Sequence, residues 1–420
     1  MKNLTAGALL ILLCTTAHAG EWTFLGFWKT YGKSFRNSPF NPAGHTVALL
    51  GYTPGPDMSL SSYMSLEGGK GNFWGCLDVK AGLDFNSGES ADVHLKLHQL
   101  YLQKDIGKHW VIVAGRIIQR WGTGFAYNPT DVAAPEKNLG DPDNSEKNAV
   151  GLDMIKLEYF GESSSAALCL LMDIKTDPAL KIKNPGCAFR IYKNFFGIDI
   201  SGVALFKHRQ KPVWGMNFAA VFGERLELHG EMSVRKGIRP AFLLEDGFLS
   251  MPSAEGAFSP PGSRKTGFLL AGLLGFQITL PGNVLWVGEI YHRSEGYTRK
   301  EWREIVTRLD SASKQNEYPQ VFSGGDIFLK GLEVFDAKGA MRNYVLNHFR
   351  IPLRRVGDIR LTWFINCSDK SFLLMPEIYL DAGNFFTFYA RSIIFQGKED
   401  SEFGGFFQDF YWEMGVRFRS

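Results

Sequence analysis

The segment from Gln408 to Ser420, QDFYWEMGVRFRS, alternates between apolar and polar residues from Trp412 to Arg419. One parity carries the apolar set, Trp412, Met414, Val416 and Phe418, and the other carries Glu413, Gly415, Arg417 and Arg419. A period of two is the signature of a β-strand with one apolar and one polar face. Similar stretches recur along the chain, at 226–235, 284–293, 359–366 and 386–394, so the alternation constrains the whole fold.

The first residues, MKNLTAGALLILLCTTAHAG, are typical of a secretory signal peptide. Lys2 supplies the positive start, Leu4 to Leu13 form a short apolar core, and Ala17-His18-Ala19 gives a cleavage site. This core is too short to cross about 30 Å of hydrocarbon as a helix. The sequence therefore predicts a cleaved signal at 1–19 and a mature protein at 20–420.

A secreted chain made of strands with one apolar face has few ways to fold. If its apolar face meets lipid, the sheet must close, because an open sheet edge is not tolerated in hydrocarbon. We expect an all-β protein, a transmembrane antiparallel up-and-down β-barrel in the outer membrane of a diderm bacterium. The 34 Phe, 14 Tyr and 10 Trp suit the aromatic girdles of such a wall. A net charge of +3 gives no indication of a nucleic-acid partner.

Connection lengths give a second indication of the same fold. Tight-turn signals occur at Gly107-Lys108, Pro281-Gly282-Asn283 and Gly383-Asn384. Long connections are expected at 123–148, 175–186, 238–265 and 297–343. A count of about 18 strands places them after the fifth, seventh, eleventh and thirteenth strands, on one rim, as in transmembrane barrels. Sixteen strands stay possible, because residues 35–57 are ambiguous.

Charged residues should mark the lumen face, because Lys or Arg at the bilayer midplane costs about 2–4 kcal/mol. The pore-lining candidates are His94, Lys96, His98, Arg116, Arg120, Glu227, Glu231, Glu289, Arg293, Arg360 and Arg391. Those from His94 to Arg120 lie on two consecutive strands and are expected to form a cationic patch. Such a patch could guide anions, or its charges could pair with carboxylates across the barrel, such as Glu377; the sequence favours neither.

The run RWGTGFAYNPTDVAAP starts at Arg120. It resembles the R-W-G-x-G-x-x-x-N-P-x-D segment of some bacterial outer-membrane porin-like proteins, and the resemblance implies a pore or an export conduit. Glycines allow a sharp turn, and Asn-Pro and Asp favour fixed turns. The loop could bend inward and narrow the channel, which we favour, or stiffen the outer rim. The constriction-loop candidates are Trp121, Gly122, Gly124, Asn128, Pro129 and Asp131.

Residues Arg299 to Leu309 form the one helix-like stretch, with Trp302, Ile305, Val306 and Leu309 on one face. A helix here could plug the pore or rest on the outer rim. Asp141, Asp143, Asn144 and Glu146 suggest a calcium loop, but they lack the full EF-hand spacing, so we expect solvated charges.

No cofactor or metal is expected. His94 and His98 would lie about 13 Å apart on a strand, from a rise of about 3.3 Å per residue, too far to share a metal. Cys169 and Cys187 are expected on opposite faces of the wall, which excludes a disulfide between them. Catalytic motifs such as G-x-S-x-G, H-E-x-x-H or a P-loop are absent from the sequence, so we expect no enzyme.

The last strand also resembles the assembly signal read by the outer-membrane insertion machinery, through Glu413-x-Gly415-x-x-Phe418. Expected partners are that machinery, membrane lipids and lipopolysaccharide, and small solutes. The predicted function is a pore for passive diffusion of small hydrophilic solutes, with anions as a candidate class. The alternatives are a specific conduit for hydrophobic compounds or polysaccharide, and a closed barrel that anchors surface loops for adhesion or envelope architecture.

Overall fold

The computed structural model describes residues 21–35, 57–85, 92–134, 149–174, 182–208, 210–237, 267–315, 339–354, 356–405 and 408–419. The predicted signal peptide, the acidic loop from Asp141 to Glu146 and most of the ambiguous 35–57 stretch lie outside these residues. The strands are β1 (Glu21–Phe35), β2 (Asp57–Lys70), β3 (Phe73–Phe85), β4 (Asp92–Ile106), β5 (Trp110–Ile117), β6 (Leu152–Phe160), β7 (Ser164–Ile174), β8 (Ile182–Phe195), β9 (Ile198–Lys207), β10 (Val213–Phe222), β11 (Leu226–Gly237), β12 (Gly267–Leu280), β13 (Val284–Arg293), β14 (Asn343–Pro352), β15 (Gly357–Asn366), β16 (Phe372–Ala382), β17 (Phe386–Gln396) and β18 (Gln408–Arg419). The described residues also contain one helix, α4 (Arg299–Gln315).

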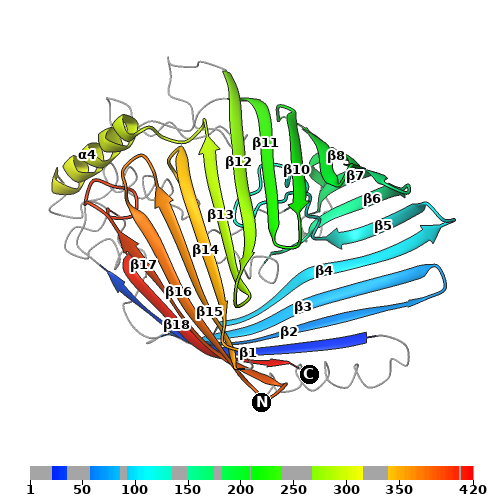
Figure 1. Ribbon diagram of the computed structural model, residues 1–420, viewed down its shortest axis with the longest axis horizontal. Helices are drawn as coiled ribbons and strands as arrows, with labels where there is room; N and C mark the ends of the chain where they lie inside the picture. The colour runs from blue at the N-terminus through cyan, green and yellow to red at the C-terminus, as the bar shows by residue number, and fades with distance from the viewer. Residues whose placement is uncertain are drawn as a thin grey trace.

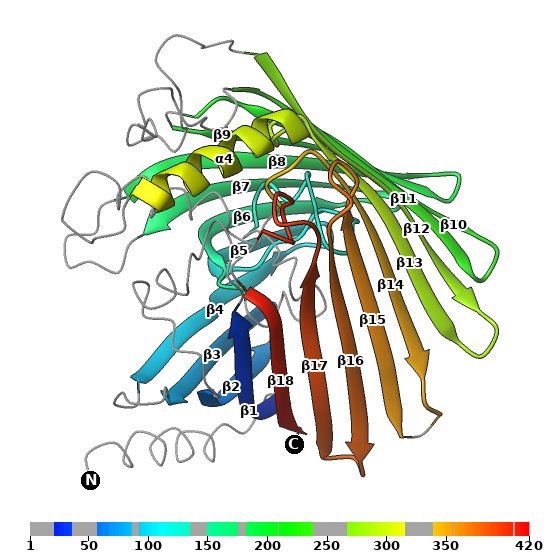
Figure 2. The ribbon, with the colours of Figure 1, turned by 90° about the vertical axis from the view of Figure 1, so that its left-hand side faces the viewer.

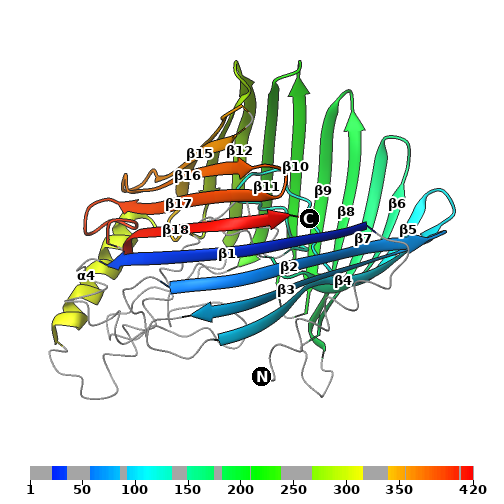
Figure 3. The same cartoon turned by 90° about the horizontal axis from the view of Figure 1, so that it is seen from below.

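These strands form one closed antiparallel barrel (Figure 1). Each strand pairs with its neighbours in sequence, and β1 pairs with β18 from Leu25 opposite Arg419 to Phe35 opposite Gln408. Figure 3 shows this seam, with β1 lying between β18 and β2. The sheet has 18 strands, which confirms the predicted fold class and removes the 16-strand alternative. Among the described residues, no helix is long and apolar enough to cross a membrane.

The wall alternates as predicted, with apolar side chains outward and polar side chains inward. On β11, Met232 is 45 % exposed on the outer face, whereas the neighbouring Glu231 is 4 % exposed inside. On β18, Met414 is 49 % exposed and Glu413 is 4 % exposed. Outward apolar side chains remain exposed because only lipid would cover them, and the inward polar groups are covered by the chain itself.

The two rims differ in the length of their connections. Connections after even-numbered strands are two to four residues long, from 71–72 to 353–356. The connections of more than ten residues follow β1, β5, β11, β13 and β17, whereas the one predicted at 175–186 after β7 is shorter than predicted, 175–181, because β8 already begins at Ile182. The prediction that the long connections gather on one rim is confirmed. In Figure 2 the short hairpins lie on the right and at the bottom, while α4 crosses the opposite end of the barrel.

Apolar side chains fill part of the interior. One cluster joins the inner faces of β12 to β17 to α4 through Trp302, Ile305 and Val306. A second cluster joins β5 to β10 through residues such as Val113, Ile117 and Met154. Cys169 belongs to the second cluster and points inward, whereas Cys187 lies on the opposite parity, and both are free thiols, as expected.

Candidate functional site

The connection after β5 turns into the barrel instead of staying at the rim. Residues 118–134 run across the interior and pack on its inner wall (Figure 2). The side chains of Trp121, Ala126, Thr130 and Ala133 are all buried there. The structure thus places the RWGTGFAYNPTD segment inside the barrel, near the middle of the strands that it contacts.

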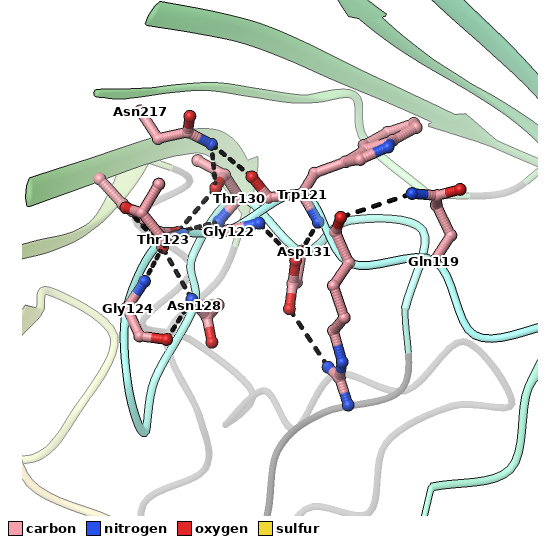
Figure 4. Close-up of polar contacts among 11 residues, drawn as sticks. Gln119, Trp121, Gly122, Thr123, Gly124, Asn128, Thr130, Asp131 and Asn217 are labelled. Carbon is pink, nitrogen blue, oxygen red and sulfur yellow. Dashed lines mark hydrogen bonds and ion pairs between the residues drawn. The ribbon is translucent and has the colours of Figure 1, made fainter. Parts of the chain in front are cut away.

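Asp131 fixes the start of this inward loop (Figure 4). Its Oδ1 accepts hydrogen bonds from the backbone N–H of Trp121 and of Gly122, both at 2.6 Å, and its Oδ2 lies 3.2 Å from the Arg120 guanidinium. A side chain at Gly122 would place Cβ 2.5 Å from the amide nitrogen of Asn128. Gly122 is therefore required for the close approach of the two arms of the loop.

Glu231, on β11, holds the middle of the loop. Its Oε1 accepts the backbone N–H of Thr123 (2.5 Å) and Gly124 (2.7 Å), and the Asn128 side-chain amide (2.8 Å). Its Oε2 accepts the N–H and the hydroxyl of Thr130, at 3.0 and 2.7 Å. One buried carboxylate thus gathers donors from both arms, and bonds to a charged acceptor are worth about 1.5–3 kcal/mol each.

Glu289, on β13, holds the tip of the loop in the same way. Its Oε1 accepts the backbone N–H of Phe125 at 2.6 Å, and its Oε2 lies 3.4 Å from the N–H of Ala126. On the wall side, His229 lies 2.9 Å from Oε1, and the Tyr291 hydroxyl donates to Oε2. The carboxylate charge is therefore shared between the loop and the wall.

Two further contacts complete the seat of the loop. The side-chain amide of Asn217, on β10, donates to the Trp121 carbonyl (2.9 Å) and to the Thr130 hydroxyl (2.8 Å). The Phe125 ring lies against His348 of β14, with centroids 4.6 Å apart. Contacts from β10, β11, β13 and β14 therefore fix one inward segment at a single height in the lumen.

The predicted pore-lining residues fall on the inner face with few exceptions. Lys96, Glu227, Arg293, Arg360 and Arg391 share the inward parity with buried neighbours, and so do Glu231 and Glu289. His94 is placed by its strand position alone, opposite Gly82. The charges of these inward-facing residues are neutralised mostly by neighbours on the same or the next strand and not by residues across the barrel.

Three arginines show this local pairing. Arg360 lies 2.5 Å from Asp358 on its own strand, and Arg391 lies 3.2 Å from Glu413 on β18. Arg293 lies 3.1 Å from Glu295, just beyond the end of β13. Asp358 and Glu413 are not among the pore-lining candidates that the sequence predicts. The alternation of the last strand does place Glu413 on its polar face, so that signal could have identified it.

The prediction that Arg116 lines the lumen is wrong. Arg116 stands opposite the outward Leu100 on β4 and makes a two-pronged ion pair with Asp153 on β6, with both bonds at 2.8 Å. The inward residues of this strand are Val113 and Ile117. The wall is apolar inside here because the inward loop packs on it, so charge does not mark the lumen face at this place.

The expected cationic patch is not assembled on one strand pair. Arg120 lies beyond β5, in the loop, beside Asp131. His98 occupies an irregular position of β4, where its ring contacts Tyr63 and its Nδ1 lies 2.7 Å from the Ala149 carbonyl. Within the described residues, no group of three His, Cys, Asp or Glu side chains is placed to hold a metal.

The helix after β13 exists as expected and extends to Gln315. Its apolar residues Trp302, Ile305 and Val306 pack onto the interior cluster, so α4 covers part of the mouth with one face in the barrel. Its outward Arg303 lies 3.3 Å from Asp400 in the β17–β18 connection. The side chain of Leu309 lies outside the described residues.

Glu402, in the same β17–β18 connection, joins three of the connections at this end. Its carboxylate accepts the N–H of Ala340 (2.6 Å), the hydroxyl of Tyr344 (2.8 Å) and the amide of Asn366 (2.8 Å). Its own N–H donates to Asp369 at 2.8 Å. Burial and the nearby charge of Asp369 together raise the pKa of Glu402 to about 7, against the hydrogen bonds from Ala340, Tyr344 and Asn366 that lower it.

Comparison with known proteins gives structural neighbours only. No protein-family model and no curated protein matches the sequence. Among solved structures, Pseudomonas aeruginosa OccK11 (OpdR) matches with a TM-score of 0.56 and 7 % identity, over 95 % of each chain. Acinetobacter baumannii OccAB1 matches at 0.55 and 8 % over 96 % of each chain. The outer membrane protein OprD from Pseudomonas aeruginosa matches at 0.50 and 6 %, over 96 % of this chain and 95 % of that one. The chain shares their barrel fold.

Proposed function

We propose that this protein is a pore in the outer membrane of a diderm bacterium, and that small hydrophilic solutes diffuse through it passively. The closed barrel supports the location, because its outer face is apolar and its backbone groups are paired around the whole ring. A neighbour of the same fold is described as an outer membrane protein. Membrane lipids, lipopolysaccharide and the insertion machinery are its partners in this proposal.

The inward loop carries the proposal of a pore. A closed anchor for surface loops needs no segment held inside its lumen by two buried wall carboxylates. Glu231 and Glu289 set the height and position of residues 123–130, and a segment fixed inside the lumen narrows it. The loop is therefore the constriction of the proposed pore.

The solute preference rests on charge along the wall. On β14 to β18 the inward arginines Arg350, Arg360 and Arg391 lie beside the carboxylates of Asp358, Glu377 and Glu413, so charges of both signs line this part of the wall. Anions stay the proposed preference, and the reversal potential described below decides it. Arg116 has no part in it, because its side chain faces outward.

A second candidate function is a specific conduit for hydrophobic compounds. The apolar clusters inside the barrel favour it, since a pore for water-soluble solutes does not need Trp302, Tyr344 and Phe364 in its interior. In the structure these side chains pack against one another and against α4. We therefore interpret the cluster as the seat of the helix, and hydrophobic transport remains the alternative.

Planar-bilayer recording tests the proposal. Stable conductance steps from the purified, folded barrel are expected, with a reversal potential in a salt gradient that indicates anions. Glu231→Gln should raise the conductance or its noise, because the loop loses a charged acceptor worth about 1.5–3 kcal/mol per bond.

Glu227→Gln is the matched control, since Glu227 lies on the same strand and the same face but makes no hydrogen bond to the loop among the contacts described. A folded, inserted protein that never conducts would contradict the pore. Equal effects of the two variants would contradict the role of the loop as the constriction.

A further inference from the structure

The interior is covered unevenly around the ring. At the height of the inward loop, the inner faces of β5 to β16 carry buried side chains throughout, including Val113, Met154, Cys169, Asn217, Glu231, Glu289, Leu346, Phe364 and Met375. The loop, α4 and the β17–β18 connection pack on these faces. A solute that crosses the barrel has to pass elsewhere.

The inner faces of β2 and β4, with Lys80 of β3 between them, are less covered than those of β5 to β16. We call six of their residues the β2–β4 wall: Tyr63, Ser65, Lys80, Lys96, Gln99 and Tyr101. Their side chains are half-buried or, at Lys96, exposed, although they lie near the middle of their strands. Asp78 lies behind them, buried, and accepts a hydrogen bond from Gln99 at 2.7 Å.

The chemistry of the β2–β4 wall suits contact with a polar solute. Lys80 and Lys96 stand directly opposite each other on neighbouring strands. Like charges in this position destabilise a sheet unless water or a counter-charge lies between them. Two phenol rings and one hydroxyl flank the lysines and can bind water or a solute hydroxyl or carboxylate. The Gln99 amide donates to Asp78, and its oxygen accepts the backbone N–H of Ile118 at 3.0 Å.

We propose that the solute path runs off-centre, between the inward loop and the β2–β4 wall, and that this wall is the part of the protein that a solute touches at the narrowest point. The proposal rests on the pore function proposed above. It assigns selectivity to side chains on β2, β3 and β4, which come from the opposite side of the ring to the carboxylates that hold the loop.

Cysteine modification can test the path. The four thiols described, Cys76, Cys169, Cys187 and Cys367, are first replaced by alanine, because Cys76 lies on the inner face of β3. Ser65→Cys and Ser233→Cys are then compared in this background. Both are the same small change on an inward-facing serine, but Ser65 belongs to the β2–β4 wall and Ser233 is buried on β11, on the covered side.

A positively charged methanethiosulfonate reagent, added during bilayer recording, should lower the conductance of Ser65→Cys by about half, since bulk and charge at a pore wall control ion passage. It should leave Ser233→Cys and the cysteine-free protein unchanged. Lys96→Cys gives the same test from β4 if Ser65→Cys does not fold, because Lys96 is the exposed member of the β2–β4 wall.

The outcomes separate this inference from the pore function. Absence of any conductance in the unmodified protein overturns the pore itself. If the reagent lowers the conductance of Ser233→Cys, or changes the conductance at none of the three positions, the pore function stands and the off-centre path is overturned.

Discussion

The ion pair of Arg116 and Asp153 places two formal charges on the outer face of the wall. The side chains keep 21 and 17 % of their surface exposed, so lipid or its head groups reach them. Two parallel hydrogen bonds of 2.8 Å neutralise the pair. Charge is tolerated outside because it is matched residue against residue on adjacent strands.

Breaking this pair should destabilise the barrel more than removing it. We expect Asp153→Asn to lower the free energy of unfolding by up to about 2–4 kcal/mol, because a lone arginine then faces lipid. The double variant Arg116→Gln, Asp153→Asn should lower the free energy of unfolding clearly less than Asp153→Asn alone, because no charge then remains on the outer face. Urea unfolding of the barrel in lipid vesicles measures both.

The exposed pair Arg303–Asp400 at the rim serves as a control, where about 0–1 kcal/mol is expected. The reversal potential of Arg116→Gln should equal that of the unchanged protein. A shift would place Arg116 in the ion path and contradict its outward position.

At the scale of elements, Glu402 couples the connections at the mouth. Its pKa of about 7 in the folded protein lies above the ordinary 4.5 of a glutamate, because burial disfavours the charge. The folded state therefore binds the proton more tightly than the unfolded state. The stabilisation is complete below about pH 4.5 and is lost as the pH rises through 7.

Hydrogen exchange of residues 397–405, corrected for the intrinsic rate, should thus show protection that falls between about pH 4.5 and pH 7. The full difference is on the order of 3 kcal/mol, from 1.36 kcal/mol per pH unit of displacement. Glu402→Gln should remove the pH dependence, because the amide stays neutral. Glu399→Gln, an exposed change in the same connection, should retain it. An equal response in both variants would mean that another group titrates.

Several elements were predictable from the sequence, and their contacts were not. Alternation placed β11, β13, β15, β17 and β18, and amphipathic spacing placed α4. The sequence also indicated that the RWGTGFAYNPTD segment turns sharply. The partners of that segment could not be found in this way, because Thr123 and Glu231 are 108 residues apart and nothing local relates them. The prediction that Arg116 lines the lumen failed for a physical reason. A loop that packs inside the barrel makes the inner wall apolar, so charge does not mark the lumen face on this strand.

At the scale of the whole molecule, the seam between β1 and β18 decides whether the sheet is a barrel. Thr30 stands opposite Met414 across this seam. Cysteines at these two positions, in a background without other thiols, should form a disulfide in most molecules, because opposite residues lie within the range that a disulfide spans.

Cysteines at Thr30 and Val416 are out of register by two residues, about 6.6 Å along the strand, and should cross-link poorly. Gel mobility before and after reduction measures both pairs. Equal cross-linking of the two pairs would contradict the fixed register of the seam.

The unequal rims have a consequence for how such a protein can change. Along one edge the chain reverses within two to four residues, so an insertion there would pull paired strands apart. Along the other edge, segments of any length can be added or exchanged while every strand keeps its two neighbours. Insertions and exchanges of exposed segments are thereby restricted to one rim, while the strands of the barrel wall can remain unchanged.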